Sequence, residues 1–485
     1  MAIEKMYEWL NENLMTFRKC FTRLATFKWF VVIVLGLMIR QDHHGVTSII
    51  RELELNPRWY ETMLHFFRSS AWNLDGLTKW WVKVVAEQGG LFCETEMPIL
   101  IGDGVKQGKE GRRMPGVKRL YQESETVSKS PYIFGHMFGA IGILVGNASK
   151  LFCVPLSMRI HDGDAQIKKW RGEVVDDESH VVRTIREACA VAIILCRKSI
   201  LLLDRYYLSV PALTALMDEQ TRAGKSLLSL VIRAKRNPTA YEEPQRNTRG
   251  RPRKKGDKVK VGELFATRLQ EFKEAVVTMY GKDESVLYYC CDLLWGNKLY
   301  QKLRFVLVLQ GDARSIFVST DLTLTPQQIL KLYGYRFKIE CSFREFKQVI
   351  AGFCYRFWSA AMPRLNRFAK KSYDPLETVT SEANKVRITN AFNAIQGFVM
   401  VAAIAFGLLQ ICASRFAHEI NAKKFRWLRS RSNDTPSEAT TAHFMGKTIF
   451  RMIAFRHDLL IMRFIHERQG GCFEGTQASN DSLGA

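Results

Sequence analysis

The sequence lacks the cysteine patterns of a zinc site or a disulfide scaffold. Its 11 cysteines are an odd number, and no C-x-x-C pairs recur at zinc-ligand spacing. We therefore expect reduced, mostly buried thiols in a cytosolic protein. The first residues show no charged-then-apolar layout, and no period of 20–50 residues repeats, so neither a secretory signal nor a solenoid is expected.

Long hydrophobic runs are also missing. The two most apolar stretches, Trp29–Ile39 and Gly397–Leu409, fall short of the roughly 18–20 residues that cross a bilayer. Both are better explained as buried core elements. The sequence therefore predicts no membrane partner.

Acidic residues are few relative to basic ones. The chain has 71 Lys and Arg against 48 Asp and Glu, a net charge of +23 and a pI near 9.6. A protein this basic usually meets a polyanion, either nucleic acid or an anionic membrane surface, and solubility alone is the plain alternative. The 47% of hydrophobic residues excludes a wholly disordered chain.

The hydrophobic pattern and the composition divide the chain into regions of different expected secondary structure. Residues 1–94 are expected to be helical, and short strands and helices alternate after about 95. Strands are expected near 200–203, 227–233, 274–280, 286–290, 305–309 and 315–320. A helix is expected over about 326–350 and another near 397–412. Arg429–Ala442 has the composition of a loop, and 467–485 that of a disordered tail.

Two short apolar runs each lead into an aspartate. Pro98–Ile101 precedes Asp103, and Ile200–Leu203 precedes Asp204. Each pattern predicts a buried strand that carries its aspartate at its carboxyl end. Taken alone, either aspartate could be an ordinary strand-end or turn residue.

The helix expected over 326–350 carries the pattern Y-x2-R-x3-E-x6-K. On a regular helix, Tyr333, Arg336, Glu340 and Lys347 fall within about 60° of one another, beside an apolar face. Such an aligned set is suited to a site. The alternative is a solvated face stabilised by i,i+4 pairs such as Arg336–Glu340.

These segments resemble a known family of enzymes. "YGYRFKIECSFREFK" (333–347) resembles the YREK signature of the DDE transposases of bacterial insertion sequences. "PILIGDGVKQGKEGRRMPGVKRL" (98–120) and "SILLLDRYYLSVPAL" (199–213) resemble the segments that carry the first two acids of that family. One departure is Tyr206, which stands where the family usually has Gly or Ala.

The resemblance implies an α/β fold with a ribonuclease H-like mixed sheet. It implies a helical N-terminal DNA-binding domain (1–94), a catalytic domain (95–385) with a β-rich insertion at about 227–322, a C-terminal helical region (386–466) and a tail (467–485). The long gap between the second aspartate and the glutamate is consistent with that insertion.

The resemblance also implies a site and a reaction. Asp103, Asp204 and Glu340 would bind two Mg²⁺ ions, with Mn²⁺ as a substitute, because hard cations prefer carboxylate oxygens. Tyr333, Arg336 and Lys347 would hold the DNA phosphate. The expected activity is metal-dependent cleavage of double-stranded DNA at the inverted repeats of an element, followed by joining of 3′-OH ends to target DNA by a homodimer.

Other basic and aromatic residues are candidates for binding DNA. Arg249-Gly250-Arg251-Pro252 resembles the core of an AT-hook, which enters a narrow minor groove. Trp295 could stack on an extruded base, although a core position is the plainer explanation. The remaining candidates, together with these, are Lys106, Arg112, Arg233, Lys235, Arg249, Arg251, Arg253 and Trp295.

Alternatives to a transposase stay open at this point. The chain could be a catalytically silent DNA-binding relative, or a metal-dependent nuclease that cuts without joining. In each case, we expect a cytoplasmic protein that works at the nucleoid.

Overall fold

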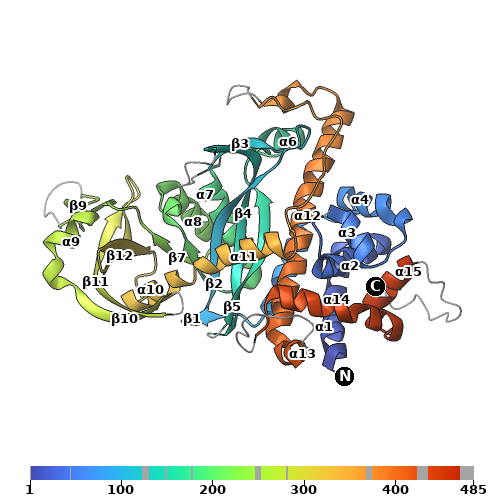
Figure 1. Ribbon diagram of the computed structural model, residues 1–485. Coiled ribbons are helices and arrows are strands. Elements are labelled where there is room, and N and C mark those ends of the chain that lie inside the picture. The colour runs from blue at the N-terminus through green and yellow to red at the C-terminus, as the bar shows by residue number, and fades with distance from the viewer. Residues whose placement is uncertain are drawn as a thin grey trace. The chain divides into compact units, whose positions relative to one another are not determined.

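The structure is a computed structural model (Figure 1) that describes residues 2–43, 45–122, 130–147, 150–175, 178–245, 253–279, 282–367, 374–422 and 435–469. The described residues form two compact units. The first unit lies within Met1–Trp80, Phe346–Phe357 and Asn393–Ala485, and the second within Trp81–Glu345 and Trp358–Phe392. The domain boundaries expected from the sequence, near 94, 385 and 466, stay a prediction.

The first unit is helical. Its core helix is apolar on all sides, and Gly36 within it allows a close approach, because a Cβ there would lie 2.4 Å from Ile49 Cγ2. The helices that belong wholly or partly to this unit are α1 (Ala2–Thr16), α2 (Leu24–Ile39), α3 (Gly45–Glu52), α4 (Tyr60–Arg68), α5 (Leu74–Gln88), α12 (Glu382–Arg415), α13 (Ala417–Ala422), α14 (Glu438–Phe455) and α15 (Leu460–Gln469).

Helix α12 is longer than the apolar run in the sequence indicates. Among the described residues, this helix alone has the length and composition of a membrane span, with a mean hydropathy of 2.1 over its most apolar 18 residues. Of that window, 94% is buried within the protein, as in the core helix of a soluble protein.

The second unit is built on a mixed sheet. Its strands are β1 (Cys93–Glu94), β2 (Met97–Gly108), β3 (Lys118–Tyr121), β4 (Tyr132–Asn147), β5 (Lys150–Ile160), β6 (Ser199–Leu203), β7 (Leu228–Arg233), β8 (Thr239–Tyr241), β9 (Lys258–Lys260), β10 (Lys273–Met279), β11 (Lys282–Trp295), β12 (Gln301–Gln310) and β13 (Ala313–Ser319). Its helices are α6 (Ala165–Trp170), α7 (His180–Leu195), α8 (Val210–Ala223), α9 (Leu264–Thr267), α10 (Pro326–Gly334) and α11 (Phe337–Gln348), whose last turn belongs to the first unit.

The strand order positions the centre of this sheet. Over the described residues it runs β3-β4-β2-β6-β7-β13-β12-β11-β8-β9, with β5 beside β4, β1 beside β2 and β10 beside β11. β2, β6 and β7 are parallel neighbours, whereas β4 is antiparallel to β2 and β5 is antiparallel to β4. Apart from Ser199 in β6 and Ser229 and Arg233 in β7, the residues of these two strands are apolar, which fits strands that are buried on both faces.

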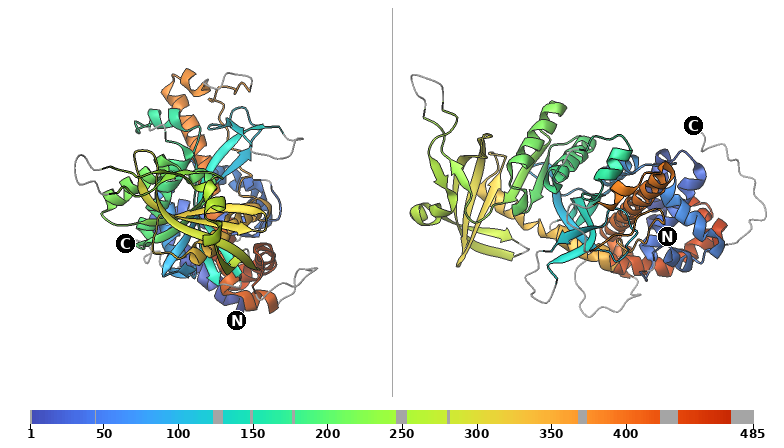
Figure 2. Two further views of the ribbon diagram at one scale, coloured as in Figure 1. Left: turned by 90° about the vertical axis from the view of Figure 1, so that its left-hand side faces the viewer. Right: turned by 90° about the horizontal axis from the view of Figure 1, so that it is seen from above.

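Two helices with well-defined ends lie on the parallel strands (Figures 1 and 2). α7 packs on β2, β4 and β7, and α8 lies beside α7. Ser179 and Ser209 begin α7 and α8, because each side chain accepts a hydrogen bond from the helix's first turn. Gly224 ends α8 in the left-handed conformation that glycine adopts without strain.

Many expected elements are present in the structure. The strands expected near 200–203, 227–233, 274–280, 286–290, 305–309 and 315–320 are confirmed as β6, β7 and β10 to β13, several of them longer than expected. The long strands β4 and β5 had no counterpart in the sequence-based prediction. The strand expected to end at Asp103 continues to Gly108, because its second half pairs with β4.

Two other expectations near the C-terminus differ from the structure. The loop expected over 429–442 is wrong from Glu438 onward, where α14 begins with Ser437 as its N-cap. Residues 423–434, which make up part of that expected loop, lie outside the described residues, as does most of the tail expected over 467–485, apart from its first three residues, which are the end of α15.

The single helix expected over 326–350 is two helices. α10 ends at Gly334 and α11 begins at Phe337, and the turn between them is closed by i→i−3 hydrogen bonds, among them Arg336 N–H to the carbonyl of Tyr333. Such bonds tighten the backbone relative to an α-helix. The prediction that all four residues of the Y-R-E-K pattern lie on one helical stripe is therefore wrong.

Candidate active site

The strand register brings two aspartates side by side. The last parallel pair recorded between β2 and β6 is Ile101 with Leu202, and two residues beyond it the chain carries Asp103 on one strand and Asp204 after the other. Adjacent strands lie about 4.8 Å apart, so these two side chains are neighbours. The backbone N–H of Gly104 donates to Asp103 Oδ1 (2.8 Å), and that of Arg205 donates to Asp204 Oδ1 (2.7 Å).

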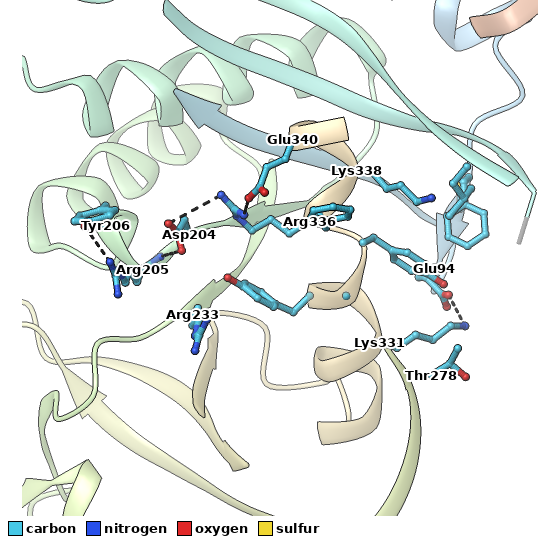
Figure 3. A pocket seen from close by; sticks show the side chains of 17 residues that line it. Glu94, Asp204, Arg205, Tyr206, Arg233, Thr278, Lys331, Arg336, Lys338 and Glu340 are labelled. Atoms are coloured by element: carbon cyan, nitrogen blue, oxygen red, sulfur yellow. Dashed lines mark hydrogen bonds and ion pairs between the residues drawn. The ribbon is translucent and has the colours of Figure 1, made fainter. Parts of the chain in front are cut away.

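The turn between α10 and α11 adds an arginine and a third carboxylate. Arg336 Nη2 lies 2.8 Å from Asp103 Oδ2 and 4.0 Å from Asp204 Oδ2, and its Nη1 lies 2.5 Å from Glu340 Oε1. Figure 3 shows the ion pairs that Asp204 and Glu340 make with the Arg336 guanidinium. We call Asp103, Asp204 and Glu340 the front-face carboxylates. They come from three distant parts of the sequence and converge on one cation.

Asp103 and Asp204 are half-buried, unlike ordinary surface acids, whereas Glu340 is exposed. Their side chains are 19%, 29% and 48% exposed in the order Asp103, Asp204, Glu340. Burial raises the pKa of Asp103 to about 6, although Arg336 and the Gly104 N–H lower it, and the other two carboxylates raise it further. The site therefore holds more negative charge than its one arginine balances.

Arg336 is held firmly but is not fully bonded. Burial alone would lower the pKa of this guanidinium, yet Asp103 and Glu340 outweigh burial and raise it. Its Nε–H is buried and has no hydrogen-bond partner in the described part of the chain. A buried donor without a partner is costly in free energy, so it is available to an incoming acceptor such as a phosphate oxygen.

A cavity of about 1190 Å³ opens beside the front-face carboxylates (Figure 3). Asp204 and Glu340 line it, together with basic side chains that include Arg205, Arg233 and Lys338. Its volume exceeds that of most small-molecule sites, which reach roughly 1,000 Å³. A cavity of this size, lined by both basic and acidic side chains, is suited to binding a segment of a polyanion.

The remaining residues of the Y-R-E-K pattern have separate positions. Tyr333 is buried at the end of α10, where its ring packs on Phe317 with centroids 4.7 Å apart, and it also lines the cavity. Lys347 is exposed on the last turn of α11 and lies over the ring of Phe353. Neither residue contributes to the ion pairs at Arg336.

The other DNA-binding candidates are spread over the second unit. Among the candidates that the structure describes, Arg233 alone lines the cavity. Trp295 is half-buried at the end of β11 and does not line the cavity. Lys106, Arg112, Lys235 and Arg253 are exposed, and Arg249 and Arg251 lie outside the described residues. Their binding of DNA stays a prediction.

Sequence reasoning missed several residues that the structure adds to the site. Lys331, paired with Glu94 Oε1 at 2.6 Å, and Lys338 line the cavity through α10 and α11. Both lysines lie within or beside the Y-R-E-K pattern, and proximity to that pattern is the one signal that could have identified them.

The donor chemistry of the front-face carboxylates suits a hard divalent cation, since it consists of carboxylate oxygens alone. In the described residues, no three His, Cys, Asp or Glu side chains are already arranged around a common metal position. The three carboxylates surround the Arg336 guanidinium instead. The residue types therefore fit a metal, and Arg336 supplies the positive charge in this structure.

Comparison with known families identifies the class of protein. A family model for DDE superfamily endonucleases matches residues 16–279, more than half of the chain, and the chain belongs to this family. Membership supports a nuclease-like function with DNA as the substrate. The matched residues include Asp103 and Asp204 and end before Arg336 and Glu340. No curated protein and no solved structure matches this chain.

Proposed function

We propose that this protein is a DNA transposase of the insertion-sequence type. It cuts DNA at the ends of its element and joins the freed 3′-OH ends to target DNA. The observation that carries the proposal is the convergence of the front-face carboxylates on Arg336 of the Y-R-E-K pattern. The family match supports the nuclease step but does not extend to the joining step.

The fold that we propose for the catalytic core is ribonuclease H-like. The order β5-β4-β2-β6-β7, with three parallel strands and an antiparallel hairpin, supports it. The β-rich insertion expected at about 227–322 lies in the chain between Asp204 and Glu340; in this proposal β7, at its start, belongs to the core sheet, and β10 to β13 belong to the insertion.

The front-face carboxylates are proposed to hold two Mg²⁺ ions. Bound divalent ions would activate the attacking oxygen and stabilise the leaving oxygen of a phosphodiester. Asp103 and Asp204 offer adjacent oxygens from neighbouring strands, and Glu340 offers one from α11. With these ions held by the carboxylates, the Arg336 guanidinium, including its unpaired Nε–H, would be available to donate to the phosphate.

Arg205, Arg233 and Lys338 are proposed to orient the DNA strand through its phosphates along the cavity. The two DNA ends are held by a homodimer, and the protein acts on DNA in the cytoplasm. These assignments follow from the family resemblance and from the basic lining of the cavity.

The test is cleavage and joining of DNA that carries the gene's own flanking sequences, with Mg²⁺ or Mn²⁺. We expect Asp103→Asn, Asp204→Asn and Glu340→Gln each to lower cleavage by about 10³-fold or more, because each removes a ligand of the metal-bound state. DNA binding, measured by fluorescence anisotropy, should persist in all three variants. Asp312→Asn, in the exposed turn before β13, is the matched control and should cleave normally.

The outcomes separate the alternatives. Cleavage without joining of 3′-OH ends would identify a nuclease. DNA binding without cleavage by the wild type would identify a silent relative, in which Arg336 permanently occupies the place of the metal. Normal cleavage by the Asp103→Asn protein would contradict the proposed site.

A further inference from the structure

A chain of buried and half-buried polar side chains lies behind the two aspartates. His161 follows β5, His180 begins α7, Glu187 lies on α7, and Tyr207 ends the short 3₁₀ helix that starts after Asp204. We call Tyr207, His180, His161 and Glu187 the back-face relay. The function proposed above does not use any of them.

Three hydrogen bonds link the relay from end to end. Tyr207 Oη lies 2.9 Å from His180 Nε2, and His180 Nδ1 lies 2.7 Å from His161 Nδ1. His161 Nε2 lies 2.7 Å from Glu187 Oε1. With neutral imidazoles, a single set of tautomers satisfies all three: each group donates toward Glu187, and Tyr207 begins the chain as a donor.

The relay lies on the opposite face of the sheet from the side chain of Asp103. A Cβ on Gly104 would lie 2.7 Å from His180 Nε2, and a Cβ on Gly102 would lie 3.0 Å from Thr184 Cγ2 of α7. Both positions therefore face α7. Because side chains alternate along a strand, Asp103 between them faces the other side, where it meets Arg336.

Glycines make room for both imidazoles. At Gly139 on β4, a Cβ would lie 1.9 Å from the His161 ring, closer than any real contact allows. Gly104, which follows Asp103 directly, has the same role for His180. The relay therefore packs against the main chain of β2 right beside Asp103, and any larger residue at these positions would displace it.

The relay also reaches the second aspartate. The backbone N–H of Tyr207 donates to the carbonyl of Asp204 at 3.0 Å, and the Tyr207 side chain is buried. Its hydroxyl is thus tied to the sheet through His180, while its main chain closes the turn that carries Asp204. Glu187 anchors the far end, with Ser157 as a further donor at 3.4 Å.

We propose that the back-face relay positions Asp103 and Asp204 by fixing the main chain at both residues from behind the sheet. The relay residues are positioning residues, because none of them touches the front-face carboxylates through its side chain in the contacts described. Catalytic groups must be held within a fraction of an ångström of their working geometry, and buried polar networks provide such rigidity. This inference rests on the proposed function where its test measures DNA cleavage. Metal affinity is a second readout, which does not depend on cleavage.

The test uses the full-length protein and two variants, Tyr207→Phe and His180→Asn. Each variant breaks the relay while keeping most of the side-chain volume. We expect kcat for DNA cleavage to fall about 10-fold, with KM for DNA unchanged, since misplacement affects the reacting geometry and not DNA binding. Mn²⁺ affinity, measured by electron paramagnetic resonance titration without DNA, should weaken about fivefold or more.

The matched control is Tyr7→Phe. Tyr7 is also fully buried and bonded to a hydroxyl, that of Thr448 at 2.9 Å, but it belongs to the helical unit. It should lose about as much stability as Tyr207→Phe, and keep wild-type Mn²⁺ affinity and kcat. The double variant Tyr207→Phe/His180→Asn should be no worse than the worse single variant, because both break one network.

The outcomes distinguish the positioning role from the transposase function. Wild-type kcat and Mn²⁺ affinity in both relay variants would overturn the positioning role, and so would equal losses in Tyr7→Phe. If the wild-type protein binds Mn²⁺ but cleaves no DNA, the transposase proposal fails, while a weakened affinity in Tyr207→Phe still supports the relay. If the wild type binds no Mn²⁺, both proposals fail.

Discussion

Two aspartates of the second unit, the half-buried Asp103 on β2 and the buried Asp321, differ in the donors that surround them. Asp321, after β13, receives the Lys198 ammonium at 2.8 Å, the Ser229 hydroxyl at 2.7 Å, and the hydroxyl and N–H of Thr323 at 2.6 and 3.0 Å. Although burial alone would raise it, these donors hold the pKa of Asp321 well below its usual range. Burial instead raises the pKa of Asp103 to about 6, and its single arginine does not compensate.

The difference separates a carboxylate that stabilises the fold from one that awaits a ligand. A buried acid with a full set of donors gains nothing from a further cation, whereas one that shares a single arginine with two other acids does. Neutralising Asp321 should therefore lower stability and leave activity unchanged. Neutralising a front-face carboxylate should lower activity and leave stability little changed.

The strongest contrast is between Asp204→Asn and Asp321→Asn. We expect Asp204→Asn to lower the rate of cleavage by about 10³-fold, with little change in the free energy of unfolding. Asp321→Asn should lower that free energy by about 2–3 kcal/mol, since it weakens several bonds to a charged group, and should leave cleavage by the folded protein near normal. Urea unfolding and single-turnover cleavage measure the two effects. Equal behaviour of the two variants would remove the distinction.

The second prediction concerns the arginine that the front-face carboxylates share. Arg336→Ala should lower cleavage by about 10²-fold, because it removes a donor aimed at the reacting phosphate. Arg336→Lys should recover part of this loss, since an ammonium restores the charge but cannot span three carboxylates as a planar guanidinium does. Lys225→Ala, at an exposed position just after α8, is the control and should stay within about twofold of the wild type. Wild-type kcat in Arg336→Ala would assign the arginine to folding alone.

The sequence predicted one half of this site better than the other. β6 carries the continuous apolar run Ile200–Leu203, so the position of Asp204 after a buried strand followed from composition. β2 was expected to stop at Asp103, because its second half is mostly glycine and polar residues. Its true length depends on pairing with β4, a contact between distant segments that no local pattern contains.

The break between α10 and α11 and the back-face relay were beyond sequence reasoning for the same reason. The break depends on i→i−3 bonds at Arg336, which the favourable helical periodicity of 326–350 conceals. The relay joins His161 to His180 and Tyr207 across three elements, and nothing beside these residues in the chain marks them as partners.

The third prediction is a pH dependence of stability. Because the pKa of Asp103 in the folded state, about 6, lies above that of an unfolded chain, about 3.9, the folded state retains a proton that the unfolded state has lost. Stability contributed by this group therefore falls as pH rises from about 4 to 6. With divalent ions removed by EDTA, Asp103→Asn should exceed the wild type by about 2 kcal/mol at neutral pH and match it near pH 4. Asp321→Asn should show the opposite sign at neutral pH.

The smallest expected effect is that of Tyr206, the residue that stands where the transposase family that this sequence resembles usually has Gly or Ala. Its ring is 44% exposed at the edge of the cavity, and its hydroxyl accepts a hydrogen bond from Arg205 at 3.2 Å. Tyr206→Ala should therefore change kcat by less than about threefold, since an exposed ring can move aside at little cost. Tyr207→Phe, one residue along the chain, removes a single oxygen and should cost more. If Tyr206→Ala raised kcat about 10-fold, the ring would be an obstacle to DNA. The two tyrosines, one facing the cavity and one bonded behind the sheet, would then differ because Tyr206 limits access to the site.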